Sequence, residues 1–179
     1  MPHNLVSSVN LLGGINSRVK DLLRTIVRNS PTTKFQAADS TANATTTLGD
    51  STYLTGITLS PNRKYVVRGM LALTNGTAAN GVKVALTLTG TQTSAASAGL
   101  VHSYDTTNTA STFTSVALSS GTQTFADAAA GTCTYIINAQ ITPQNEGILK
   151  IQFAENASGG GTAVLKKGSW LEVRELDVD

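Results

Sequence analysis

Reactive and charged side chains are scarce in this chain of 179 residues. Charged residues make up 13% of it, against roughly 25% in an average soluble domain. The single cysteine, Cys133, excludes an internal disulfide and a cysteine metal cluster, and its strand-like surroundings favour a buried thiol. The only histidines are His3 and His102, and the acidic residues are dispersed, without the close carboxylate pair of a glycosidase. We therefore expect no enzyme activity, no cofactor and no metal site.

Long apolar runs and strong net charge are also absent. The net charge of +2 is too small to imply a nucleic-acid partner, and no apolar run approaches the roughly 20 residues that cross a bilayer. The start, "MPHNLVSSVNLLGG", lacks the basic region and apolar core of a secretory signal. We expect synthesis in a cytoplasm without membrane attachment, so the sequons at Asn43, Asn75 and Asn156 carry little weight.

Thr, Ser, Ala, Gly and Asn take the place of the missing charges, and this composition favours strands and turns. After Pro31, apolar residues alternate with polar ones, as in antiparallel sheets with one buried face. The predicted inward sets are Tyr65, Val67, Leu71 and Leu73; Val82, Val84, Leu86 and Leu88; Tyr135, Ile137, Ala139 and Ile141; and Leu149, Ile151 and Phe153. The pattern predicts an all-β fold, an antiparallel β-sandwich or jelly roll.

Turn signals separate these segments. Hairpins are predicted at Asn75-Gly76, Asn80-Gly81, Pro61-Asn62 and Pro143-Gln144-Asn145. The small-residue stretches "TQTSAASAGL" (91–100) and "TFADAAAGT" (124–132) are expected to be surface loops. Near the end, residues 153–176 are interpreted as a closing hairpin with Gly159-Gly160-Gly161 at its tip, because these glycines precede a strand and not a phosphate-binding helix.

The segment before Pro31 has helical spacing instead. Its apolar stripe consists of Leu12, Ile15, Val19, Leu22 and Ile26, and its other face carries Arg18, Lys20, Arg24 and Arg28 against Asp21. That face is either a solvated polar surface or a basic arm that docks on an acidic partner. We expect an N-terminal arm with a short amphipathic helix over residues 1–33 and a β-sandwich domain over residues 34–179.

The end of the chain carries its only tryptophan, in "GSWLEVRELDVD". If Leu171 and Val173 face the core, Trp170 lies on the opposite face beside Arg174 and is suited to anchor a contact. Alternatively, Gly168-Ser169 bends the strand and Trp170 is an ordinary core residue.

Two stretches resemble a module of tailed-bacteriophage virion proteins. "LSPNRKYVVRGMLALTNGTAANGVKVALTLTG" is similar to its strand, small-residue turn and Val-Lys-apolar strand, and "ILKIQFAENASGGGTAVLKKGSWLEVREL" to its closing strands. The resemblance covers residues 50–176 and implies a β-sandwich that assembles with its own copies, often as trimers, on the outside of a virion. The short basic arm departs from the long attachment region of a tail fibre.

The leading hypothesis is a capsid decoration or cement protein on the virion surface. Its expected partners are its own copies, as a homotrimer, and the major capsid protein or another virion protein. The alternatives are a small head-fibre or tail-spike tip that binds a host receptor and, from a different class, a carbohydrate-binding module, although few aromatic residues are on offer. The expected interface residues are Val19, Leu22, Ile26, Arg18, Arg24, Arg28, Trp170 and Arg174.

Overall fold

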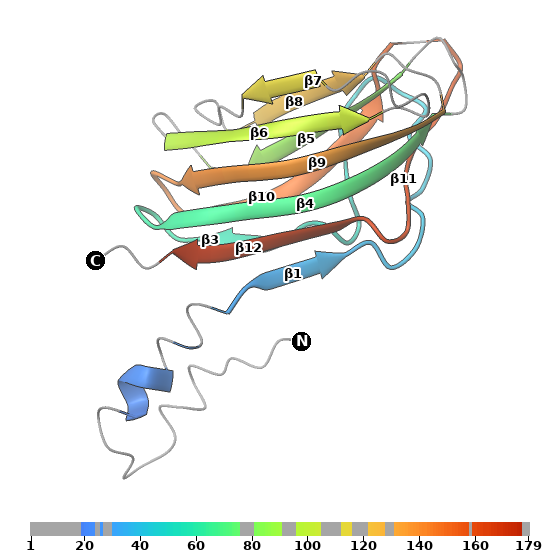
Figure 1. Ribbon diagram of the computed structural model, residues 1–179. Coiled ribbons are helices and arrows are strands. Elements are labelled where there is room, and N and C mark those ends of the chain that lie inside the picture. The colour runs from blue at the N-terminus through green and yellow to red at the C-terminus, as the bar shows by residue number, and fades with distance from the viewer. Residues whose placement is uncertain are drawn as a thin grey trace.

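The chain forms two antiparallel β-sheets stacked face to face, as the computed structural model shows (Figure 1). The predicted all-β sandwich is therefore confirmed. The structure describes residues 19–23, 26, 30–75, 81–90, 96–104, 112–115, 122–127, 131–157 and 159–176.

The larger sheet has seven strands. Its order is β1 (Thr32–Phe35), β12 (Trp170–Leu176), β4 (Lys64–Asn75), β9 (Gly131–Thr142), β6 (Ala96–Tyr104) and β7 (Thr112–Ser115), and β11 (Ala163–Leu165) also pairs with β4. The smaller sheet has five strands, in the order β2 (Gly49–Asp50), β10 (Gly147–Glu155), β5 (Val82–Leu88) and β8 (Thr122–Asp127), with β3 (Ile57–Leu59) also paired to β10.

The pairing is that of a jelly roll. If β3, β11 and the β6–β7 pair are set aside, the first strand pairs with the last (β1 with β12), and then β2 pairs with β10, β4 with β9 and β5 with β8. This is a long antiparallel hairpin wound over itself into two sheets. The β6–β7 pair is inserted between β5 and β8 and widens the larger sheet beyond β9.

Alternate residues of these strands fill the space between the sheets. All of the inward sets predicted from the sequence are buried, and the buried apolar cluster runs from Leu54 to Val173. Tyr135 is fully buried, and its hydroxyl donates a hydrogen bond of 3.1 Å to the carbonyl of Val82 in the opposite sheet. Cys133 is buried as expected. Period-two patterning therefore predicted the core correctly.

The predicted hairpins are wrong, because the turns connect the two sheets. Pro61-Asn62 lies between β3 and β4, residues 76–81 lie between β4 and β5, and Pro143-Gln144-Asn145 lies between β9 and β10. In each case the two strands belong to different sheets. Turn residues such as Asn62, with φ of 59°, reverse the chain equally well in either arrangement. Gly76 and Asn80 lie outside the described residues.

Two further expectations from the sequence are wrong. The stretches expected to be loops contribute to β6 and β8, since β9 and β5 supply hydrogen-bond partners for small residues that show little pattern alone. The closing segment is not a hairpin, because β10 lies in the smaller sheet while β11 and β12 both pair with β4. The glycine-rich stretch at 159–161 therefore crosses from one sheet to the other.

The described helical residues of the arm lie outside the two sheets (Figure 1). Residues 19–23 and 26 are helical, and they extend beyond the edge formed by β1 (Figure 1). Within the described ranges, no helix has the length and apolar character needed to cross a membrane.

Candidate interaction surface

The described residues offer little material for catalysis. Among them, no group of three or more His, Cys, Asp or Glu side chains is placed to hold a metal ion. His3 lies outside the described ranges, and only the backbone of His102 is described, in β6. The surface of the sandwich offers the candidate site, and the closing segment positions Trp170 on it.

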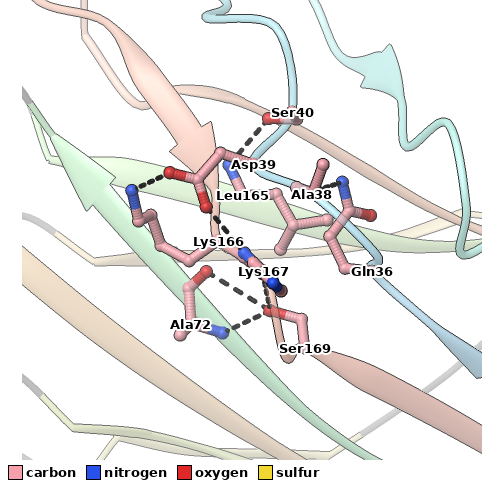
Figure 2. Close-up of polar contacts among 9 residues, drawn as sticks. All are labelled: Gln36, Ala38, Asp39, Ser40, Ala72, Leu165, Lys166, Lys167 and Ser169. Carbon is pink, nitrogen blue, oxygen red and sulfur yellow. Dashed lines mark hydrogen bonds and ion pairs between the residues drawn. The ribbon is translucent and has the colours of Figure 1, made fainter.

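A four-residue bend interrupts the edge of β4 between β11 and β12. β11 pairs with Leu73–Asn75 and β12 pairs with Lys64–Met70, which leaves Ala72 facing the bend. The buried Ser169 hydroxyl accepts a hydrogen bond of 3.0 Å from the Ala72 N–H and donates one of 2.8 Å to the Lys166 carbonyl (Figure 2). The Lys166 N–H also donates to the Ala72 carbonyl. One hydroxyl therefore replaces the strand partner that the bend removes.

The segment that follows β1 binds the other side of this bend. Gln36 and the bend exchange two backbone hydrogen bonds, from Gln36 N–H to Ser169 O (2.8 Å) and from Gly168 N–H to Gln36 O (3.0 Å). Ser40 exchanges a further pair with Leu165. Its N–H donates to the Leu165 carbonyl, and its hydroxyl accepts from the Leu165 N–H (Figure 2). The segment that follows β1 is thus fixed to the last strands of the chain.

Asp39 adds a charged contact to the same place. Its carboxylate accepts a hydrogen bond from the Lys166 side chain and another, of 2.8 Å, from the Lys167 N–H (Figure 2). The hydrogen bond from Lys166 is the main cause that holds the pKa of Asp39 below its ordinary value. Lys166 therefore has an acidic partner within its own chain.

Because the bend holds Ser169 inward, Trp170 begins β12 on the outer face of the larger sheet. Leu171 is fully buried and Val173 is buried, whereas Trp170 is half-buried. The prediction that Trp170 lies opposite the core is therefore confirmed, and the alternative of an ordinary core tryptophan is wrong. Trp170 lines a hollow of about 360 Å³ together with Arg68, Gly69, Met70, Ile136, Ile137 and Asn138.

The strand register extends this hollow into an apolar row across the sheet. Phe35 of β1 is opposite Trp170, Trp170 is opposite Met70, and Met70 is opposite Ile136. Phe35 is 61% exposed, Ile136 41% and Met70 39%. We call these four residues the outer row. Aromatic side chains, Met and Arg are the residue types enriched in protein interfaces.

Charges of both signs flank the outer row. Arg68 and Glu172 are opposite one another in the next row of the same face, and Arg174 follows beside Val66. The ion pairs found among the described residues include none between Arg68 and Glu172. Arg174 is exposed on the same face as Trp170 but does not line the hollow, where Arg68 lies instead.

The three described residues of the arm stripe are all exposed. Leu22 is 60% exposed, Ile26 53% and Val19 44%, so none of them packs in the sandwich core. Arg18, Arg24 and Arg28 lie outside the described residues. The structure thus presents two separate apolar surfaces, the arm stripe and the outer row.

Sequence reasoning found Trp170 but missed its neighbours in the hollow. Met70 and Ile136 occupy the outward positions of strands whose inward positions are already apolar, in "VVRGMLAL" and "YIINAQI". An apolar residue at a solvent-facing position of an alternating strand is the sequence feature that could have indicated these neighbours. That these residues lie beside Trp170 depends on the strand order, which no local pattern contains.

Comparisons with known proteins identify no family for this chain. The chain matches no protein-family model, and no curated protein is significantly similar to it. Among solved structures it is similar to the infectious bursal disease virus VP2 subviral particle, with 8% identity, a TM-score of 0.27 and coverage of 84% of this chain and 42% of that chain. A structure of the Gx strain of the same virus matches with 9% identity, a TM-score of 0.21 and coverage of 82% and 40%. This chain spans less than half the length of either protein, and at such TM-scores neither likeness carries an argument.

Proposed function

We propose that this protein is a phage virion structural protein, a capsid decoration or cement protein that forms homotrimers and attaches through its arm to the major capsid protein or another virion protein. It acts by binding and not by catalysis. The observation that carries the proposal is the exposed arm stripe outside a core that begins at Leu54. Since Val19, Leu22 and Ile26 do not belong to the described core, they are available for a contact outside the sandwich.

Three further observations support a structural role. The jelly roll is an architecture that capsid domains use, although it also occurs in lectins and cupins and does not by itself decide function. The net charge of +2 allows many copies to pack closely without strong repulsion. The outer row gives the sandwich a surface suited to a protein neighbour.

The experiment that tests attachment neutralises the basic face of the arm. Replacing Arg18, Arg24 and Arg28 by Gln should leave the sandwich folded but lower the number of copies bound per particle. The residual binding should depend less on salt, because exposed charge contacts are screened over about 10 Å at 0.1 M salt. A matched control replaces three sandwich lysines, Lys64, Lys83 and Lys167, by Gln.

Removing residues 1–30 is the stronger form of the test. The shortened protein should remain folded, because the described core contains no residue of this segment, and should lose attachment. Wild-type occupancy with either arm variant would contradict the proposal and assign the contact to the sandwich.

A glycan-binding role at the virion surface is the second candidate. The hollow is lined by Trp170 together with the polar residues Arg68 and Asn138, and small-molecule ligands such as sugars bind sites that combine apolar and polar groups. Titration of host surface polysaccharide should then quench the fluorescence of Trp170, the only tryptophan. An unchanged spectrum would exclude this candidate.

A further inference from the structure

Two apolar surfaces of this chain are exposed and have matching dimensions. On an α-helix, Val19 and Ile26 lie seven residues apart, which corresponds to roughly 10 Å along the helix axis. In the outer row, Trp170, Met70 and Ile136 occupy three adjacent strands, which also corresponds to roughly 10 Å across the sheet. The arm stripe therefore has the length to cover the tryptophan, methionine and isoleucine of the row at once.

The shapes also match. The sheet face is hollowed at a site lined by Trp170, Met70 and Ile136, while the arm presents three exposed apolar side chains. An amphipathic helix that lays apolar residues into a groove is a recurring mode of recognition. A helix as short as the one in the arm is marginal in water by itself, so its conformation depends on such a surface.

The position of the arm decides between its own sandwich and another copy. Residues 27–31 can extend to roughly 17 Å, which is enough for the arm to fold back over its own sheet. The described helical residues instead lie beyond the edge strand β1 (Figure 1), and Val19, Leu22 and Ile26 all remain exposed. Because one chain leaves both surfaces uncovered, each can be covered by the equivalent partner surface of a neighbour.

We infer that the arm helix of one copy binds the outer row of the next, with Val19, Leu22 and Ile26 against Trp170, Met70 and Ile136. This inference rests on the self-association part of the proposed function. Such a contact is heterologous, and it closes into a ring when the rotation between copies allows, as in a trimer. The basic residues lie on the opposite side of the helix in the sequence pattern, so they remain available for an acidic shell.

Trp170 reports directly on this contact, because it is the only tryptophan in the chain. Light scattering and tryptophan emission should be followed over a dilution series of the full-length protein. Oligomer formation should be accompanied by a blue shift of the emission. Leu22→Asp should remove the shift and weaken association on the order of 10- to 100-fold, the effect of losing one buried leucine side chain per contact.

Ile148→Asp is the matched control. Ile148 is 42% exposed on β10 of the other sheet, so this variant makes the same change from an apolar residue to a carboxylate away from both surfaces. Its association and emission should equal those of the wild type. Circular dichroism and thermal melting should show that both variants are folded. If Ile148→Asp abolishes association while Leu22→Asp does not, the interface lies on the smaller sheet and the inference is wrong.

A complementation experiment separates neighbouring copies from a single chain. Leu22→Asp has a defective arm and an intact outer row, whereas Ile136→Asp has an intact arm and a defective row. Mixing the two should restore the blue-shifted emission, because the arm of the second variant binds the row of the first. A blue shift that is independent of concentration in the wild type and is not restored by mixing would show that each arm binds its own sandwich, and would overturn the inference.

The outcomes also separate this inference from the proposed function. Oligomers whose formation leaves the emission of Trp170 unchanged would retain self-association and overturn the arm contact. Failure to attach to particles, with the blue shift and complementation intact, would remove the cement role and keep the arm contact. The emission of Trp170 can be interpreted without the attachment assay, and the attachment assay can be interpreted without the emission of Trp170.

Discussion

Replacing Ser169 by Ala tests the bend that fixes the closing strands. The hydroxyl is fully buried and is the partner of the Ala72 N–H, at 3.0 Å, in the gap between β11 and β12. Its loss leaves the Ala72 N–H and the Lys166 carbonyl each without this partner, and one unsatisfied buried donor costs about 1–3 kcal/mol. Since Ala72 is only half-buried, we expect a loss of about 2 kcal/mol in the free energy of unfolding.

Urea denaturation and thermal melting measure this loss. For a chain of this length, about 2 kcal/mol lowers Tm by about 4–8 °C. Ser60→Ala is the matched control, because Ser60 is exposed and the described contacts give its hydroxyl no hydrogen bond; the change should stay within about 0.5 kcal/mol. If Ser169→Ala costs no more than Ser60→Ala, water replaces the hydroxyl and the bend does not depend on this side chain.

Two further predictions concern the smaller sheet. Gly147→Ala should lower the free energy of unfolding by about 3 kcal/mol, because a Cβ at this position would lie 2.3 Å from the Thr89 carbonyl oxygen. The control is Gly160→Ala, at φ of +82° but in open space, which should lower the free energy of unfolding by only about 1 kcal/mol. Equal losses for the two variants in urea denaturation would contradict the clash at Gly147. Asp50 accepts hydrogen bonds from Lys150, and these are the main cause that lowers the pKa of Asp50 below 3.8 in the folded state. The contribution of the Asp50 carboxylate to the free energy of unfolding is therefore present above pH 3.8 and is lost as the pH falls through the lower, folded-state pKa. The stability difference between the wild type and Asp50→Asn should therefore shrink at low pH, and a difference that is constant from pH 7 to pH 2 would refute this.

The sequence carries enough information to assign residues to the inside and the outside of the fold. Tyr65, Val67, Ile137 and Ile151 are buried where the alternation places them, because the two faces of a strand always alternate with period two. The same rule gave Trp170 an outward direction on the condition that Leu171 and Val173 face the core, and the structure shows that both are buried.

Local signals could not decide which strands pair. Pro143-Gln144-Asn145 reads as a hairpin turn, but β9 and β10 belong to opposite sheets. Turn chemistry fixes the reversal of the chain, while the pairing of β9 with β4 depends on residues about 65 positions away in sequence. Likewise, the small residues of β6 and β8 become strands only because β9 and β5 present unpaired edges to them.

The sequence and the tertiary structure also determined different parts of the candidate surface. The sequence alone determined the apolar stripe of the arm and showed that Trp170 faces outward if Leu171 and Val173 face the core, because helix and strand periods are local properties of the backbone. Only the tertiary structure brought Phe35, Met70 and Ile136 into one row with that tryptophan. These four residues come from four strands, and their alignment is set by strand order and register, which are decided by long-range hydrogen bonding and core packing.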